Sequence, residues 1–247
     1  MSDRRPLAVV SGAGRGIGAA TARALAADGW DVVVGFHRDR DAADAVGDEC
    51  VRLGARAFTV QADLSQPAEV DRFWHVIDEQ GGQVAGLVNN AGVVSPRADV
   101  ADMSADRLRR LLDVNVVGAF LMAGAAVRRM AHSRGGSGGV IVNVSSRAAI
   151  RGGSGEYVDY AASKAAVDVL TAGLALEVAR DGIRVVGIRP GLIDTEIHVP
   201  GRLERLTPDV PMARAGRPEE VAEAIRWLMS DQASYVTGST LDVGGGR

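Results

Sequence analysis

The chain contains 247 residues, of which 47% are hydrophobic and 24% are charged, as in ordinary soluble globular proteins. Its formal charge is −3 and it has no basic block, which disfavours nucleic acid as a partner. The single cysteine, Cys50, excludes a disulfide framework within the chain, and the four histidines lack metal-ligand spacing, so we expect no metal. The apolar stretch Leu7–Val10 is too short for a signal peptide or a membrane span, which favours a cytoplasmic protein.

Short apolar runs alternate with longer Ala-rich segments of helical periodicity along the whole chain. The runs are mostly β-branched and do not alternate with polar residues, as expected of strands covered by helices on both faces. We predict strands at Leu7–Val10, Val32–Val34, Ala57–Val60, Gly86–Val88, Val140–Val144, Arg184–Ile188 and, at the edge, Thr240–Val243. We predict helices at Ile17–Asp28, Ala42–Leu53, Pro67–Gln80, Ser104–Met130, Tyr157–Arg180 and Pro218–Met229. The pattern predicts a single-domain α/β fold over residues 1–247, a doubly wound (Rossmann-type) parallel sheet flanked by helices on both faces.

A glycine-rich turn, Ser11–Gly18, lies between the first predicted strand and the first predicted helix. Glycines allow the backbone to turn sharply and to approach a pyrophosphate, and the helix N-terminus adds N–H donors and a positive dipole. The spacing of Gly12, Gly16 and Gly18 differs from that of the common Gly-x-Gly-x-x-Gly fingerprint, so the turn alone is a weak signal. Its place between a buried strand and an Ala-rich helix favours a nucleotide site over a plain tight turn.

The end of the second predicted strand indicates which nicotinamide nucleotide is preferred. A free ribose 2′-hydroxyl usually meets an acidic residue there, but this strand ends in Gly35, and Asp39 comes only after an arginine. Arg15 and Arg38 would instead suit a 2′-phosphate, because guanidinium matches phosphate geometry. The alternative is that both arginines are solvated surface residues. We predict NADP(H), with NAD(H) as the second choice.

Tyr160 and Lys164 open a predicted helix and lie four residues apart, on one helix face. A nearby ammonium lowers the pKa of a phenol from its usual value of ~10, which would make the pair an acid/base for a carbonyl or an alcohol. The spacing alone is common on surface helices. Polar or turn residues at the ends of three predicted strands strengthen it, because ligands of parallel sheets bind there. These residues are Asn89–Gly92, Asn143–Ser146 and Arg189–Gly191.

In this order, the motifs resemble the short-chain dehydrogenase/reductase family over essentially the whole chain. The stretch Gly155–Lys164 looks most like a bacterial subgroup of uncharacterised reductases. Each motif is weak by itself, whereas the ordered set is highly specific. The matching positions are Ser11–Gly18, Asp63, Asn89–Gly92, Asn115, Ser146, Tyr160, Lys164, Pro190, Gly191, Thr195, Tyr235–Gly238 and Asp242–Gly245.

The resemblance implies four catalytic residues. Tyr160 would be the general acid in reduction and the base in oxidation. Lys164 would hold the nicotinamide ribose and lower the pKa of Tyr160. Ser146 would hydrogen-bond the substrate oxygen, and Asn115 would hold a water that relays protons from Lys164.

Two departures from the family pattern bear on these roles. Ser146 precedes Tyr160 by one position more than in most members, so Ser145 is an alternative to it. Tyr157 is a rival phenol, but Ala161 rather than a lysine follows it by four positions, and Tyr160 keeps the role.

The resemblance also implies a cofactor site along the strand ends. Asp63 would meet the adenine, and Asn89 with the Ala91-Gly92 backbone would line the adenosine ribose. Ile193 and Thr195 would hold the nicotinamide carboxamide. The full set is Ser11, Gly12, Arg15, Gly16, Ile17, Gly18, Arg38, Asp63, Leu64, Asn89, Ala91, Gly92, Tyr160, Lys164, Pro190, Gly191, Ile193 and Thr195.

We therefore expect an NADP(H)-dependent oxidoreductase that interconverts a small carbonyl compound and a secondary alcohol. Alternatives with the same chemistry are a 3-oxoacyl-(acyl-carrier-protein) reductase and a glucose 1-dehydrogenase. A non-catalytic NADP-sensing regulator is disfavoured because Tyr160 and Lys164 are both present, and an epimerase or dehydratase because little chain follows Arg184–Ile188.

The substrate and the assembly are less well defined by the sequence. The predicted substrate loop, at about residues 192–217, contains no aromatic residue and fixes no substrate type. By family analogy we expect a homotetramer, or a homodimer, formed through helices Ser104–Met130 and Tyr157–Arg180 and the closing strand.

Overall fold

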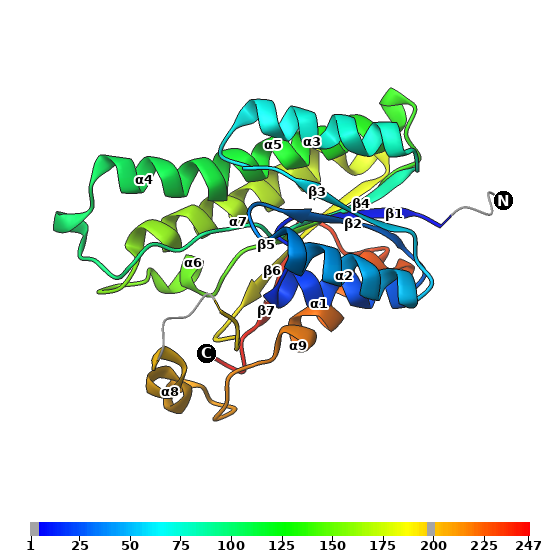
Figure 1. Ribbon diagram of the computed structural model, residues 1–247. Coiled ribbons are helices and arrows are strands. Elements are labelled where there is room, and N and C mark those ends of the chain that lie inside the picture. The colour runs from blue at the N-terminus through cyan, green and yellow to red at the C-terminus, as the bar shows by residue number, and fades with distance from the viewer. Residues whose placement is uncertain (1–4, 197–200) are drawn as a thin grey trace.

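Seven parallel strands form one twisted sheet at the centre of the protein (Figure 1). The computed structural model describes residues 5–196 and 201–247. The strand order is β3-β2-β1-β4-β5-β6-β7, so the direction of winding reverses between β1 and β4, where open parallel sheets bind ligands. The strands are β1 (Leu7–Val10), β2 (Asp31–Phe36), β3 (Ala57–Gln61), β4 (Val84–Asn89), β5 (Gly139–Val144), β6 (Ile183–Pro190) and β7 (Thr240–Val243).

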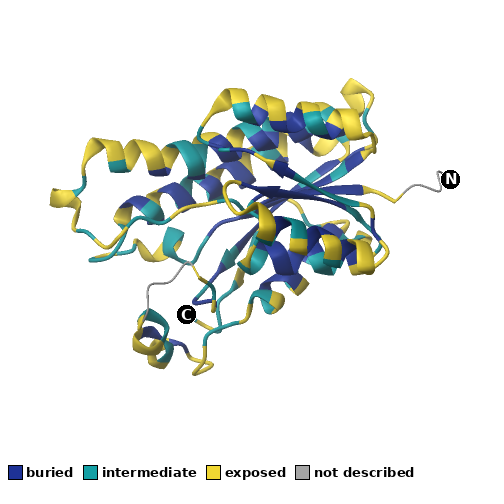
Figure 2. Cartoon of the chain, viewed as in Figure 1, coloured by how far each residue is buried: buried dark blue, intermediate teal, exposed yellow. Residues whose placement is uncertain are grey.

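Helices cover both faces of the sheet and bury its side chains, which confirms the predicted doubly wound α/β fold (Figures 1 and 2). On one face lie α1 (Gly16–Ala27), α2 (Arg40–Arg52) and α9 (Pro218–Met229). On the other lie α3 (Pro67–Gln80), α4 (Ala105–Leu112), α5 (Gly118–Met130) and α7 (Val158–Val178). Each layer has its own apolar core, because alternate residues of a strand point to opposite faces. Two short helices, α6 (Ala148–Arg151) and α8 (Arg202–Leu206), lie beyond the carboxyl ends of the strands.

All seven predicted strands are present, and helices α3 and α9 have the predicted bounds. Pro218 occupies the first turn of α9, and the Glu220 carboxylate accepts a hydrogen bond from the Arg217 N–H at 2.8 Å. Helix α2 begins two residues earlier than predicted, because the Asp39 side chain caps it through the Ala42 N–H at 3.0 Å.

The predicted continuous helix Ser104–Met130 is wrong in one respect: a π-helical turn, Asp113–Val117, separates α4 from α5. A π turn inserts one extra residue and re-aims the side chains around it. Here it turns Asn115 into the interior, where its amide bonds the backbone of Val93. The stretch Ala105–Met130 is long and apolar enough to cross a membrane by composition, but it packs on α3, α7 and β4 as a core helix does.

Two other predicted segments differ from expectation: one helix ends earlier, and the substrate loop contains regular structure. Helix α7 ends at Val178 and continues as a single 3₁₀ turn, Ala179–Asp181. The predicted substrate loop, 192–217, contains α8 and a parallel bridge between Ile193 and Gly216. Its residues 197–200 lie outside the described part of the chain. Leu192, Leu206 and Val210 form a small apolar cluster that folds the loop onto itself.

Candidate active site

A cavity of about 1510 Å³ runs along the carboxyl ends of the strands, from the glycine-rich turn to α8. Strand ends and the loops that follow them form its walls, as the winding of the sheet predicts. Among the lining residues are Ser11, Gly12, Arg15, Gly16, Ile17, Arg38, Asp63, Leu64, Ala91, Gly92, Ser146, Tyr160, Lys164, Pro190, Gly191, Ile193 and Thr195. The structure thus brings all but three of the predicted site residues to one cavity, the exceptions being Gly18, Asn89 and Asn115.

The glycine-rich turn is tied to the end of β4. The Ser11 hydroxyl accepts hydrogen bonds from the N–H groups of Asn90 and Ala91, both at 3.0 Å. Gly12 has φ +63°, and a Cβ there would lie 3.0 Å from the Ala91 Cα. Because no side chain caps α1 at Arg15, the first-turn N–H groups of the helix are available to a phosphate beside the turn. The turn therefore fits a dinucleotide pyrophosphate.

Two other glycines shape this turn. A Cβ on Gly18 would lie 2.3 Å from the Gly12 carbonyl oxygen, so Gly18 allows α1 to pack on the turn without lining the cavity. Gly16 has φ +54°, and a Cβ there would lie 3.3 Å from the Thr195 Cγ2. Thr195 therefore approaches the turn from across the cavity.

Two arginines bring positive charge to the cavity, Arg15 from the glycine-rich turn and Arg38 from the loop after β2. Arg15 and Arg38 are both exposed, line the cavity and make no ion pair with any described residue. Asp39, the nearest carboxylate after Gly35, caps α2 instead. Both guanidinium groups are therefore available to an anionic group in the cavity.

The part of the cavity predicted to bind adenine is lined by Asp63, Leu64 and their neighbours. The Asp63 carboxylate accepts hydrogen bonds from the Ser65 N–H at 3.0 Å and the Ser65 hydroxyl at 2.8 Å. Burial opposes ionisation, but these bonds outweigh it and lower the pKa of Asp63. Leu64 is buried beside it.

Asn89 was expected at the adenosine ribose, but the structure places it away from the cavity. Its Nδ2 donates to the Ala119 carbonyl at 2.9 Å and to the Asn143 Oδ1 at 3.3 Å, inside the α5–sheet layer. Strand alternation explains the difference, because neighbouring residues at a strand end point to opposite sides. Asn90 lines the cavity instead and donates to the carbonyls of Ser11 and Gly12.

Tyr160 and Lys164 lie on one face of α7, at the opposite end of the cavity from Arg38. The Lys164 Nζ lies 5.8 Å from the centre of the Tyr160 ring and donates to the Val144 carbonyl at 2.8 Å. Lys164 is the only lysine in the sequence. Burial lowers the pKa of Lys164 to about 8, although the Asp168 carboxylate raises it.

Burial dominates the pKa of the Tyr160 phenol. Burial raises it to about 12, while the hydrogen bond with Ser146 and the positive charge of Arg202 act to lower it. The Lys164 ammonium donates to the Val144 carbonyl, and its expected lowering of the Tyr160 pKa stays a prediction. Tyr160 is therefore a neutral phenol at pH 7, suited to donate a proton.

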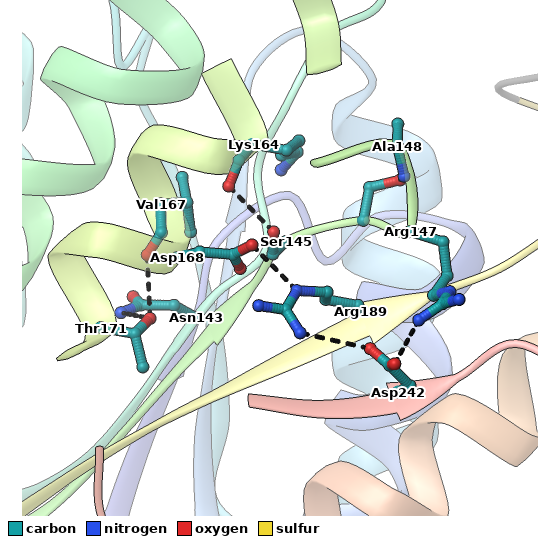
Figure 3. Close-up of polar contacts among 11 residues, drawn as sticks. Asn143, Ser145, Arg147, Ala148, Lys164, Val167, Asp168, Thr171, Arg189 and Asp242 are labelled. Atoms are coloured by element: carbon teal, nitrogen blue, oxygen red, sulfur yellow. Dashed lines mark hydrogen bonds and ion pairs between the residues drawn. The ribbon is translucent and has the colours of Figure 1, made fainter. Parts of the chain in front are cut away.

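The structure distinguishes Ser146 from Ser145. The Ser145 hydroxyl is buried and donates to the Lys164 carbonyl at 2.9 Å, so it anchors α7 to β5 (Figure 3). Ser146 lines the cavity and hydrogen-bonds Tyr160. Helix α6 and the glycines that follow it lie between Ser146 and Tyr160, where the extra residue is predicted to be accommodated.

Asn115 lies close to Lys164 but does not line the cavity. Its Oδ1 accepts the Val93 N–H at 2.8 Å, and its Nδ2 donates to the Val93 carbonyl at 2.9 Å and to the Ser163 hydroxyl at 3.1 Å. A Cβ on Gly92 would lie 3.3 Å from the Lys164 Nζ and 3.4 Å from the Asn115 Oδ1, so glycine leaves both side chains room at the end of β4. Asn115 thus fixes the strand-end backbone against α7, and its role in a proton relay stays a prediction.

The nicotinamide side of the predicted site follows β6. Gly191 packs against Gly244, whose Cα would lie 2.6 Å from a Cβ on Gly191. Pro190 and Ile193 are buried at the cavity wall. The wall is therefore held close to the chain that follows β7.

A chain of ion pairs that the sequence analysis did not identify lies behind Lys164 (Figure 3). Arg189 on β6 donates to the Asp168 Oδ2 at 2.8 Å and to Asp242 on β7 at 3.4 Å, and Arg147 also pairs with Asp242. The other Asp168 oxygen, Oδ1, is buried without a hydrogen-bond partner among the described residues. Asp168 follows Lys164 by four residues, one helical turn. This spacing is the only feature of the sequence that indicates an interaction between them.

Curated relatives match nearly the whole chain. The family model described as Enoyl-(Acyl carrier protein) reductase matches residues 12–247. The chain is 50% identical to the uncharacterized oxidoreductase YgfF of Escherichia coli K12, covering 98% of this chain and 99% of that protein. It is 37% identical to glucose 1-dehydrogenase 2 of Bacillus subtilis, covering 97% and 93%. It is 38% identical to 3-oxoacyl-[acyl-carrier-protein] reductase of Synechocystis, covering 97% and 96%.

Solved structures match the fold equally well. Acetoin dehydrogenase YohF from Salmonella typhimurium superposes with a TM-score of 0.90 at 35% identity, covering 98% of this chain and 96% of that one. A blue fluorescent protein from a metagenomic library, in complex with NADPH, gives 0.91 at 33% identity, covering 98% and 97%. The chain belongs to the short-chain dehydrogenase/reductase family of oxidoreductases.

Proposed function

We propose that the protein is an NADP(H)-dependent oxidoreductase that interconverts a small carbonyl compound and a secondary alcohol. The observation that carries the proposal is the placement of Tyr160, Ser146 and Lys164 at one end of a cavity whose other end is the glycine-rich turn. In this proposal, residues 1–247 form one domain that both binds the nucleotide and performs catalysis, and the protein is cytoplasmic.

The chemistry follows from the catalytic side chains. When bound, a nicotinamide supplies or accepts the hydride. In the reductive direction, the hydroxyls of Ser146 and Tyr160 hydrogen-bond the carbonyl oxygen, and Tyr160 donates the proton that completes the alcohol. Because the pKa of Tyr160 is about 12, its phenol holds that proton at neutral pH. In the oxidative direction the same oxygen must act as base, so oxidation should be faster at alkaline pH.

The preference for NADP(H) over NAD(H) rests on Arg15 and Arg38. Both are exposed at the end of the cavity where β2 ends, and the nearest carboxylate, Asp39, is used to cap α2. The NADPH complex of a structural neighbour at 33% identity is consistent with this choice.

Replacing both Arg15 and Arg38 with alanine should weaken NADPH binding by about 10- to 100-fold, the loss expected for hydrogen bonds to a charged group. NADH affinity should change by less than about threefold, since NADH has no 2′-phosphate for these arginines. A fluorescence titration of each variant with both nucleotides measures this. The matched control is Arg128→Ala, because Arg128 is exposed on α5 and does not line the cavity. A wild-type protein that binds NADH more tightly would contradict the NADP preference.

The substrate within this chemistry is not given by the relatives. Glucose 1-dehydrogenase 2 and a 3-oxoacyl-[acyl-carrier-protein] reductase match the chain almost equally, at 37% and 38% identity. Both activities remain alternatives, tested by assaying glucose with NADP⁺ and a 3-oxoacyl thioester with NADPH. A regulator that binds NADP without turnover is disfavoured by the complete Tyr160, Ser146 and Lys164 set.

We further propose a homotetramer that uses the outer face of α7. Val169 and Leu176 lie two helical turns apart on this face, and their relative exposures are 73% and 85%. Exposed apolar patches mark interaction sites, and we infer that these two residues belong to one.

Replacing both Val169 and Leu176 with glutamate should convert the tetramer into smaller species, because charges would be buried in the interface. Sedimentation velocity measures the change. Val51→Glu is the control, since Val51 is 52% exposed on α2, on the opposite face of the sheet. A wild-type protein that sediments as a monomer would contradict the proposal.

A further inference from the structure

Three arginines converge on two consecutive residues beside the catalytic tyrosine. Arg202 and Arg205 of α8 pair with the two oxygens of the Glu156 carboxylate, at 3.0 and 2.7 Å. Arg97, from the loop after β4, donates to the Gly155 carbonyl at 2.7 Å. All five residues line the cavity.

This arginine cluster (Arg97, Arg202 and Arg205 around Glu156) touches the catalytic end directly. Arg202 lies 5.0 Å from the centre of the Tyr157 ring and hydrogen-bonds its hydroxyl. The Tyr157 ring in turn packs edge-on against the Tyr160 ring, with 5.7 Å between the ring centres. A substrate whose carbonyl oxygen reaches Tyr160 would therefore extend its far end toward the cluster.

The charge of this part of the cavity is positive. Glu156 is ionised, because its hydrogen bonds with Arg205 and Arg202 outweigh burial and lower its pKa to about 2. The Glu156 carboxylate thus pairs with two guanidinium groups, Arg97 donates to the neighbouring Gly155 carbonyl, and Arg151 lines the cavity without an ion pair to any described residue. The whole chain, by contrast, has a formal charge of −3. Concentrated positive charge in a cleft of an acidic protein attracts anionic ligands.

The burial of Arg202 and Glu156 favours a small molecule, and not an acidic protein, as the ligand of the cluster. The side chains of Arg202 and Glu156 are only 14% and 18% exposed and face the cavity, whereas that of Arg205 is 55% exposed. Planar guanidinium groups in such a setting bind carboxylate or phosphate through paired hydrogen bonds.

We propose that the arginine cluster is a subsite for an anionic group of the substrate, so that the enzyme acts on small oxo or hydroxy compounds that carry a carboxylate or a phosphate. This inference rests on the proposed function for the identity of the reacting group. The subsite itself is defined by binding, and binding can be measured apart from turnover.

The test is calorimetric titration of the full-length protein, with and without NADP⁺, using matched probe pairs. Levulinate and methyl levulinate differ in a carboxylate, and dihydroxyacetone phosphate and dihydroxyacetone differ in a phosphate. We expect the anionic member of at least one pair to bind ten or more times more tightly than its neutral partner. The pair that shows the difference identifies carboxylate or phosphate as the preferred group.

Variants test whether the arginine cluster causes the preference for the anionic probe. Arg202→Gln should reduce the affinity for the anionic probe at least tenfold and change that for the neutral probe by less than twofold. Arg97→Gln, at an exposed position, should act in the same direction if Arg202→Gln fails to fold. Arg128→Gln, which removes a charge outside the cavity, should leave both affinities unchanged.

Equal binding within both pairs, no binding of either anion, or a preference that survives Arg202→Gln and Arg97→Gln would overturn the subsite. Failure of the proposed function has a different signature. In that case the protein would bind neither nicotinamide nucleotide, while the anion preference measured without NADP⁺ would persist.

Discussion

Tyr160→Phe should reduce turnover by about 10³- to 10⁴-fold while NADPH still binds, because the substitution removes only the hydroxyl that donates the proton. The ring stays in its contacts with Tyr157 and Lys164, so the shape of the cavity is preserved. Steady-state kinetics should show the loss in kcat and in kcat/KM alike, as expected of an interaction formed in the transition state. A fluorescence titration with NADPH then verifies that the nucleotide site is intact.

Tyr157→Phe is the matched control, because Tyr157 is a neighbouring phenol whose hydroxyl contacts Arg202 and not Ser146. It should retain at least a tenth of wild-type activity. A Tyr160→Phe protein with near-normal kcat, or a Tyr157→Phe protein with the larger loss, would move the acid/base role to Tyr157. The pH profile adds an independent readout, since a phenol with a pKa of about 12 predicts that oxidation accelerates steadily above pH 8.

The parts of this site that could be predicted are those with local sequence signals. Strand and helix periodicity located every element of the sheet, and the bounds of α9 followed from Pro218 and the acidic residues beside it. The Gly turn and the Tyr160–Lys164 spacing are also local, because a helix places residues four apart on one face whatever surrounds it.

The parts that could not be predicted depend on contacts between segments distant in sequence. The π turn at Asn115 exists because its amide bonds Val93, 22 residues away, and no local pattern in Ser104–Met130 signals it. The sequence analysis placed Asn89 at the adenosine ribose, whereas Asn90 is the residue that lines the cavity, because the phase of a strand end depends on its neighbours in the sheet. The arginine cluster joins loops 46 and 58 residues apart, so its charge is visible only in the fold.

The environment of Lys164 connects catalysis with stability. Burial within the cavity wall holds its pKa at about 8, below the ordinary value of 10.5, which means that the folded protein carries an ammonium in an unfavourable place at pH 7. One hydrogen bond to the Val144 carbonyl and the charge of Asp168 offset this cost only in part. The buried Lys164 ammonium is therefore a cost to folding that its proposed catalytic role explains.

Lys164→Met should lower turnover by about 10²- to 10³-fold, because the cation beside Tyr160 is lost. It should also stabilise the fold at pH 7, by about 1–2 kcal/mol, since each pKa unit of depression corresponds to about 1.4 kcal/mol and the lost hydrogen bond offsets part of the gain. Denaturant unfolding of wild type and variant measures the difference. Lys164→Arg, which keeps the charge, should not be stabilised.

The stability difference between wild type and Lys164→Met should depend on pH. Between pH 8 and 10.5 the unfolded lysine holds a proton that the folded one has released, so wild-type stability should rise through that range while the Met variant lacks the increase. The difference between the two proteins should therefore shrink as pH rises. Because the sequence has a single lysine, protein labelled with ¹³C at the lysine ε-carbon gives one resonance that titrates with Lys164. A midpoint near 10.5, or a wild-type stability that stays flat across the range, would contradict the burial argument and place the ammonium in solvent.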